Sequence, residues 1–159
     1  MTISELMNID AGRQGKAASC IVELIKIYHE VKTESIPDPL KAQYGGRNMI
    51  NTYYVVFKFL VTSDTGSKHT VIIKTSPDFN LSGWENNTAE VYCDCQDFMY
   101  RSAYTLKGSS ALFLNDKTKL TLGQALSTPP KRTTSLLCKH AYAALKWFIS
   151  NYANLMKTV

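Results

Sequence analysis

The sequence lacks the features that assign a chain to several common functional classes. No apolar run approaches the ~20 residues that a transmembrane helix needs, so we expect no membrane span. The first residues contain no basic segment followed by an apolar stretch, which predicts no signal peptide and folding in the cytoplasm. There is also no G-x-S-x-G, no glycine-rich phosphate loop and no H-E-x-x-H. With no catalytic constellation visible, we expect a protein that is not an enzyme.

Cysteine and histidine are scarce, at four and three residues, but most of them fall into two short motifs. Cys93 and Cys95 are one residue apart, and Cys138 and His140 follow with the same spacing. Three thiolates and one imidazole complete a four-coordinate zinc site, and the absence of an export signal favours metal-bound thiolates over disulfides. The alternative is three small buried hydrophobic residues and an unrelated histidine. The spacing predicts that these four residues bind a metal ion.

Both motifs place their ligands at i and i+2, which has different consequences in a strand and in a helix. In an extended chain such side chains point the same way, so Cys93 and Cys95 can share one ion. On a helix they diverge by roughly 200°, because each residue turns about 100°. Cys138 must therefore lie just before a helix whose first turn carries His140, and Thr134 and Ser135 are placed to start that helix.

Four protein ligands leave no open coordination position, so the expected centre is structural rather than catalytic. Zinc suits a Cys3His set best, and a [4Fe-4S] cluster is the close alternative, because histidine can replace cysteine as a cluster ligand. Closing the roughly 40-residue loop between the two motifs costs chain entropy, which metal coordination can offset.

The chain of 159 residues is 45% hydrophobic, enough for a core of its own. We expect a single domain, 1–159, of the α+β class: an antiparallel β hairpin extended by a third strand and flanked by an N-terminal and a C-terminal helix. Hydrophobic periodicity predicts helices over residues 17–31 and 138–157. Composition and turn signals predict strands over 51–62, 69–75 and 89–93, the first of them rich in β-branched and aromatic residues, and a loop over 40–51, which contains Gly45-Gly46. The last helix has a wide apolar surface, which indicates either a partner surface or a buried helix.

The positive charge is concentrated between the two motifs. Residues 101–134 hold six basic residues and one acid, and so account for the whole net charge of +5. We interpret residues 102–134 as a basic loop inserted into a metal-site segment, 91–145. Such a loop either contacts nucleic acid or an acidic protein surface, or is simply a solvated loop.

Residues near the motifs allow further expectations. Asp97 either accepts the His140 ring N–H, caps backbone amides, or is an ordinary turn aspartate. Phe98 and Tyr100 are expected to shield the metal site, and Arg101 to donate to a carbonyl or carboxylate. Cys20, far from the motifs in an apolar stretch, is expected to be a buried free thiol. His29 and His69 have no partner at ligand spacing.

The motif spacing, C-x-C, a long insert and then C-x-H, resembles the SWIM zinc finger. Members of that family use the finger for DNA or protein interaction within larger proteins. This resemblance covers residues 93–140 and depends on four positions.

A longer match covers residues 91–145. Cys93-Asp94-Cys95-Gln96-Asp97-Phe98-Met99-Tyr100-Arg101, then Pro129-Pro130 and Cys138-Lys139-His140, resemble virion structural proteins of contractile-tailed (T4-like) bacteriophages, of the baseplate-wedge type. That family's signature has proline where this chain has Gln96.

The phage resemblance implies a non-catalytic subunit of the tail baseplate, present in multiple copies per virion and contacting other tail proteins. It implies location in the virion after assembly in the host cytoplasm, with no membrane contact and no nucleic-acid partner. The alternative is a SWIM-like zinc-binding module for nucleic-acid or protein interaction.

Overall fold

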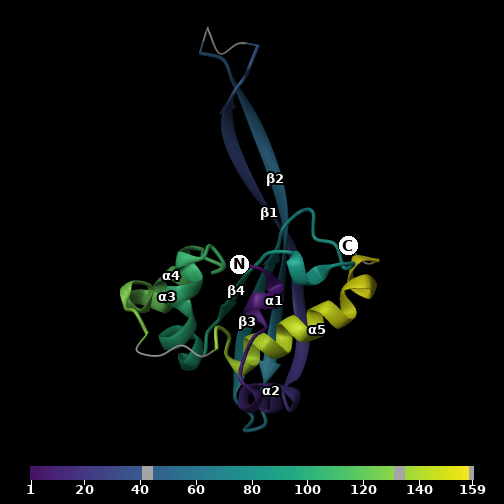
Figure 1. Cartoon of the computed structure of the whole chain (residues 1–159), viewed down its shortest axis with the longest axis vertical. Coiled ribbons are helices and arrows are strands. Elements are labelled where there is room, and N and C mark those ends of the chain that lie inside the picture. The colour runs from purple at the N-terminus through teal and green to yellow at the C-terminus, as the bar shows by residue number, and fades with distance from the viewer. Residues whose placement is uncertain (41–44, 131–134, 158–159) are drawn as a thin grey trace.

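The structure is a computed structural model that describes residues 1–40, 45–130 and 135–157 (Figure 1). It confirms the α+β class, with one antiparallel sheet and helices at both ends of the chain. The elements are α1 (Ile3–Leu6), α2 (Ala11–Ala18), β1 (Ile21–Pro37), β2 (Arg47–Thr62), β3 (Lys68–Thr75), η2 (Trp84–Asn86), β4 (Ala89–Cys93), η3 (Phe98–Ser102), α3 (Ala103–Gly108), α4 (Asp116–Leu122), η4 (Gly123–Ser127) and α5 (Lys139–Met156).

The four strands follow one another in the sheet in chain order, and every neighbouring pair is antiparallel. The predicted strands 51–62, 69–75 and 89–93 all lie within β2, β3 and β4. The turn at residues 63–67 joins β2 to β3, and Gly66 takes the positive φ of 84° that this turn requires. In the β3–β4 ladder Val71 pairs with Cys93, so the first metal motif begins where this ladder ends.

The helix predicted over residues 17–31 is wrong. Helix α2 ends at Ala18, and β1 begins at Ile21. A β-bulge at Ile25, between Leu24 and Lys26, explains the misleading pattern. Before the bulge Leu24 pairs with Phe59, and after it Ile27 pairs with Phe57, so apolar residues on one face are spaced by three instead of two. A strand with a bulge therefore imitates the spacing of a helix.

The loop predicted over residues 40–51 is also wrong for residues 47–51, which belong to β2; residues 41–44 lie outside the described part. Strands β1 and β2 pair as far as Pro37 and Arg47, whereas β3 reaches β2 only from Val55 onward. Residues 30–37 and 47–54 therefore form a two-stranded extension, which we call the arm. It projects away from the body of the protein (Figure 1). Each of its strands has eight residues, so the arm is about 25 Å long.

Helix α5 packs on the face of the sheet formed by the odd-numbered residues of β2 (Figure 1). Phe148 lies 4.8 Å from Phe57, measured between ring centroids, and Trp147 lies 5.6 Å from Phe59. Phe57, Phe59 and Phe148 are fully buried. The wide apolar surface of this helix is thus mainly core, while Met156 near its end stays exposed.

The interval expected to be a basic loop, residues 102–134, is largely helical where the structure describes it. The π-helical turn η3 runs directly into α3, and α4 and η4 follow. Leu106, Phe113 and Leu122 are buried and anchor this region to the core. Lys131 and Arg132, two of its five basic residues, lie outside the described part. Across the described residues, no helix combines the length and apolarity needed to cross a bilayer.

Candidate metal centre

The first two predicted ligands stand at the end of a strand. Cys93 is the last residue of β4, and Cys95 follows two residues later, before the chain turns into η3. Both side chains are buried. The sulfur of Cys95 accepts a hydrogen bond from the backbone N–H of Phe98 at 3.3 Å. This bond fixes the sulfur and favours its thiolate form.

The second pair stands at the start of α5, as the spacing argument requires. Cys138 is the N-cap residue of α5, with extended backbone angles, and His140 lies in the first turn. The sulfur of Cys138 accepts the backbone N–H of Ala141 at 3.4 Å. The prediction that Ser135 starts this helix is wrong, because its hydroxyl binds Asp10 instead; Thr134 lies outside the described residues. The cap is Cys138 itself, one of the four candidate ligands.

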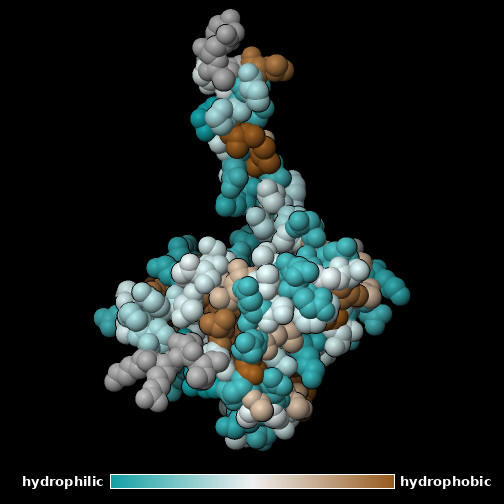
Figure 2. Space-filling model, in the orientation of Figure 1, coloured by the Kyte–Doolittle hydropathy of each residue, from teal (hydrophilic) through white to brown (hydrophobic). Residues whose placement is uncertain are grey.

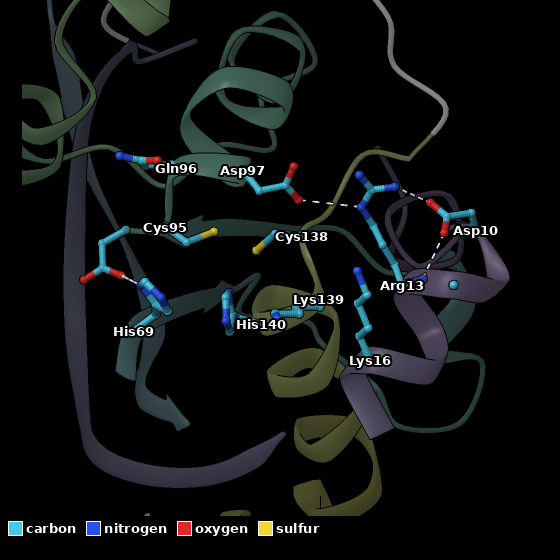
Figure 3. A pocket seen from close by; sticks show the side chains of 12 residues that line it. Asp10, Arg13, Lys16, His69, Cys95, Gln96, Asp97, Cys138, Lys139 and His140 are labelled. Carbon is cyan, nitrogen blue, oxygen red and sulfur yellow. Dashed lines mark hydrogen bonds and ion pairs between the residues drawn. The ribbon is translucent and has the colours of Figure 1, made fainter. Parts of the chain in front are cut away.

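The fold brings all four predicted ligands together. The three sulfurs and a ring nitrogen of His140 lie within 4.8 Å of one another, and all four residues are buried. Figure 3 shows the sulfurs of Cys95 and Cys138 pointing toward each other beside the His140 ring. Around one tetrahedral ion with bonds of about 2.3 Å, ligand atoms are separated by about 3.8 Å. The four side chains could therefore hold one metal ion after a small contraction.

The charges of the cluster also fit a bound cation. Burial raises the pKa of the Cys93 thiol and of the Cys138 thiol well above the usual range. The thiols of Cys138 and Cys93 donate hydrogen bonds to Cys95 and lower the pKa of that thiol. Three buried thiolates without a counter-charge repel one another and are poorly solvated. A divalent cation supplies the missing positive charge and allows all three to ionise together.

The surroundings of the His140 ring give a second argument for a metal ion in the cluster. Both of its ring nitrogens are buried, and neither has a hydrogen-bond partner. A buried polar atom without a partner costs about 1–3 kcal/mol. Coordination of a metal ion through one nitrogen removes that cost for that atom. The orphaned imidazole therefore supports a metal in the cluster.

His69 and Asp94 lie beside the cluster, and the sequence reasoning missed this pair. The ring of His69 packs against the ring of His140, with centroids 4.4 Å apart. Its Nδ1 lies 3.0 Å from a carboxylate oxygen of Asp94, which also accepts the Thr70 backbone N–H. The register of β3 against β4, with Val71 opposite Cys93, places His69 near the metal motif. A correct pairing of the two predicted strands would have found it.

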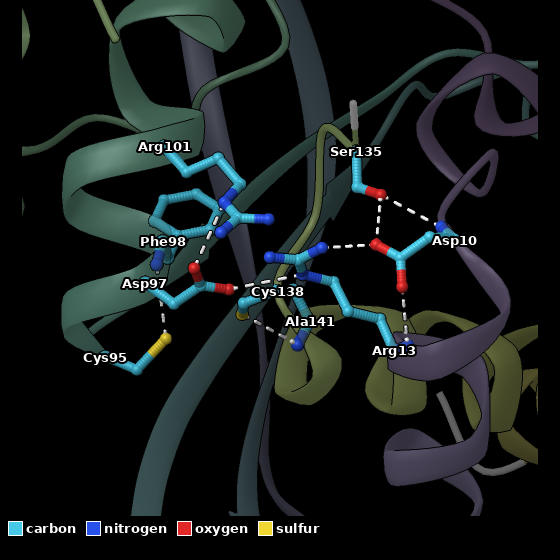
Figure 4. Close-up of polar contacts among 9 residues, drawn as sticks. All are labelled: Asp10, Arg13, Cys95, Asp97, Phe98, Arg101, Ser135, Cys138 and Ala141. Atoms are coloured by element: carbon cyan, nitrogen blue, oxygen red, sulfur yellow. Dashed lines mark hydrogen bonds and ion pairs between the residues drawn. The ribbon is translucent and has the colours of Figure 1, made fainter. Parts of the chain in front are cut away.

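A chain of charged groups connects the surroundings of the cluster (Figure 4). Asp97 lies between two arginines, with Arg101 Nε at 3.1 Å and Arg13 Nε at 3.6 Å. Arg13 also pairs with Asp10, which accepts the hydroxyl hydrogen of Ser135 at 2.9 Å. The network joins α2, η3 and the segment leading to Cys138, so it holds both halves of the centre in place.

Asp97 and Arg101 form an ion pair beside the cluster. Asp97 neither accepts a hydrogen bond from His140 nor caps η3. Arg101 donates to a carboxylate as expected, and that carboxylate is Asp97. Burial raises the pKa of the Asp97 carboxyl, although the nearby Arg13 opposes this.

The two aromatic residues expected to shield the centre behave differently. Phe98 is fully buried and stacks edge-on against Tyr92. Tyr100 is 69% exposed, so the expectation that it covers the centre is wrong. Cys20 is a free thiol, as expected, but is only half-buried between α2 and β1. It takes no part in the cluster.

The Asp10 carboxyl gives a pH-dependent prediction. The backbone N–H of Arg13, the Ser135 hydroxyl and the Arg13 side chain lower the pKa of Asp10 to about 2. Because this pKa lies below the unfolded value near 4, the ionised group stabilises the fold above about pH 4. That contribution is lost as the pH falls toward 2. Asp10→Asn keeps an N-cap acceptor but carries no charge.

We expect wild type to be more stable than Asp10→Asn at neutral pH and the difference to shrink between pH 4 and pH 2. Thermal unfolding of both proteins at a series of pH values measures it. A difference that stays constant down to pH 2 contradicts the role assigned to the charge.

A cleft of about 690 Å³ opens beside the cluster, lined by residues of α2, the C-x-C motif and the start of α5 (Figure 3). Arg13, Lys16 and Lys139 contribute positive charge to its wall. Cys95 and His140 border it with only 4% and 5% of their surface exposed. The cluster is therefore nearly sealed from the cleft.

No protein-family model matches the chain, and no curated protein or solved structure gives a significant match. The function of this chain is therefore inferred from the geometry of the cluster and the shape of the molecule.

Proposed function

We propose that the chain is a non-catalytic structural subunit of a contractile phage tail, of the baseplate-wedge type, with one structural zinc ion. The observation that carries the proposal is the closed cluster of Cys93, Cys95, Cys138 and His140. These residues are the ones on which the resemblance depends, and Arg101 of the same motif braces Asp97 beside them. With four protein ligands the ion has no open position for a substrate.

Zinc is favoured over an iron–sulfur cluster on spatial grounds. All four ligand atoms lie within 4.8 Å of one another, which suits a single ion. A [4Fe-4S] cluster places a cube of iron and sulfide between its ligands and so needs them further apart. The role proposed for zinc is to join the end of β4 to the start of α5, which fixes the helix that covers the sheet.

The arm supports a role in assembly. It extends beyond the body and carries exposed apolar side chains on both faces: Val31, Ile36, Met49, Ile50 and Tyr53. Figure 2 shows this hydrophobic surface on the arm, separated from the body. A two-stranded hairpin alone is marginally stable in water. Neighbouring subunits that enclose the arm would stabilise it, as in an interlocked particle.

The test is the composition of purified particles. Virions from the source of this sequence are dissociated, and tails and baseplates are separated by sedimentation and analysed by mass spectrometry. The proposal predicts this chain in the baseplate fraction at a fixed ratio to the other subunits. Its absence from particles contradicts the proposal, and so does recovery with the genome instead of the tail.

A SWIM-like nucleic-acid module is the second candidate, favoured by one observation. A cavity of about 320 Å³ between the sheet and α4 is lined by Lys26, Lys58 and Lys117. Within the described ranges none of the three pairs with a carboxylate. Phosphate contacts from these lysines would give DNA affinity that falls steeply with salt. Fluorescence anisotropy with duplex and single-stranded DNA at several salt concentrations distinguishes the candidates, because the tail proposal expects no such binding.

A further inference from the structure

The two edges of the sheet differ in how they are covered. At the β4 edge the N–H of Val91 donates to Ala111 at 2.9 Å, and the N–H of Phe113 donates back to Val91 at 3.1 Å. At the other edge, no strand or bridge of the described residues pairs with the outer side of β1. β1 is 17 residues long, and an open edge of this length is a template for another strand. We propose that β1 pairs antiparallel with β1 of a second copy of this chain, centred on Val31.

The charges of β1 are complementary to themselves in this register. A two-fold axis perpendicular to the sheet at Val31 places Glu30 of each copy opposite Lys32 of the other, on the same face. The axis pairs Lys26 with Ile36, Ile27 with Ser35, Tyr28 with Glu34, His29 with Thr33, and Val31 with itself. No like charges face each other, and the two bodies lie at opposite ends of the joint ladder.

Other symmetric registers fit less well. Centring on Glu30 or Lys32 places like charges opposite each other. Centring on Tyr28 pairs Lys26 with Glu30 but places the bulge at Ile25 inside the joint ladder, opposite Val31. Centring on Thr33 pairs Lys32 with Glu34 but shortens the overlap. In the Val31 register residues 26–36 of both copies pair without interruption, because the bulge at Ile25 lies just outside the paired residues.

Exposed apolar residues at the two ends of β1 support the same arrangement. Ile21 and Ile25 are 70% and 52% exposed near the base of the strand. Ile36 and Leu40 are 38% and 87% exposed near the tip of the arm. Antiparallel pairing brings the tip of each arm to the base of β1 in the other copy. The arm is neutral over its described residues, with two acids and two bases, so charge does not oppose this contact.

The first test is a symmetric crosslink in a Cys20→Ser background. In the proposed register two copies of Val31→Cys face each other across the axis, at Cα separations near 5 Å that allow a disulfide. Thr33→Cys is the matched control, because its copies are four residues out of register, roughly 13 Å apart along the strand. Oxidised glutathione and non-reducing gels should give dimers for Val31→Cys and few for Thr33→Cys. Equal crosslinking of the two variants overturns the register, and no crosslinking overturns the proposal.

The second test uses charge reversal and sedimentation equilibrium of the full chain. Glu30→Lys or Lys32→Glu alone places like charges opposite each other twice, and should weaken the dimer about tenfold. Within each copy Glu30 also pairs with Lys74 at 2.8 Å, and Lys32 pairs with Glu34 at 3.1 Å. The unfolding temperature of every variant is therefore measured beside its dimer constant, and the double variant Glu30→Lys/Lys32→Glu should dimerise more tightly than either single variant. A wild-type protein that stays monomeric at its highest soluble concentration overturns the proposal, as does a double variant no better than the singles. This inference does not depend on the identity of the particle, so it can fail while the tail proposal stands.

Discussion

Replacing Cys138 by serine is expected to abolish metal binding and to lower the thermal unfolding temperature by about 10 °C. Serine is a preferred N-cap residue, so the variant retains a cap for α5 while it loses a metal ligand. The proposed ion would close a loop of roughly 40 residues, and a cross-link of that length stabilises by about 4 kcal/mol in the chain-entropy model. For a domain of this size, that free energy corresponds to a shift of roughly 10 °C.

The matched control is Cys20→Ser, which changes the half-buried thiol outside the cluster. We expect Cys20→Ser to keep its metal and to unfold within a few degrees of wild type. Calorimetry and metal content, measured on the same samples, make the comparison. Equal stability of the two variants contradicts a structural role for the centre.

Truncation of Phe148 to alanine is expected to cost about 3–5 kcal/mol, because it leaves a cavity in a well-packed core. Phe148 is fully buried and contacts the rings of Phe57, Phe79 and Tyr152. It holds α5 on the sheet, and α5 carries His140. The variant should therefore also bind metal more weakly. Urea unfolding and competition with a chelator measure the two effects.

Tyr100→Ala is the control for that truncation, because its ring is exposed and the residue lies in η3, which follows the C-x-C motif. It should change stability by less than about 0.5 kcal/mol. If Phe148→Ala is less stable but binds metal with full affinity, metal binding does not depend on the packing of α5 against the sheet.

The clustering of the four candidate metal ligands could be predicted from the sequence because the geometry of each pair is local. Each pair is separated by one residue, and the only helical arrangement that lets Cys138 and His140 converge places the first at the cap and the second in the first turn. The fold class and three strands were likewise confirmed. These strands are rich in β-branched and aromatic residues, which favour strands over helices.

What could not be predicted depends on long-range pairing or on local irregularity. The bulge at Ile25 shifts the alternation of β1, so its periodicity matched a helix. Residues 47–51 form a strand only because β1 pairs with them, and they have no core contact to leave a pattern. The position of His69 beside His140 follows from the β3–β4 register, which the predicted strands alone do not fix.

The most direct test of the central claim is metal analysis of protein purified without oxygen, with its visible absorption spectrum, beside Cys138→Ser. We predict one zinc ion per chain in a colourless wild-type protein and none in the variant. A brown protein with about four irons per chain identifies an iron–sulfur cluster instead. A wild-type protein that is folded but free of metal contradicts the central claim and makes these cysteines ordinary core residues.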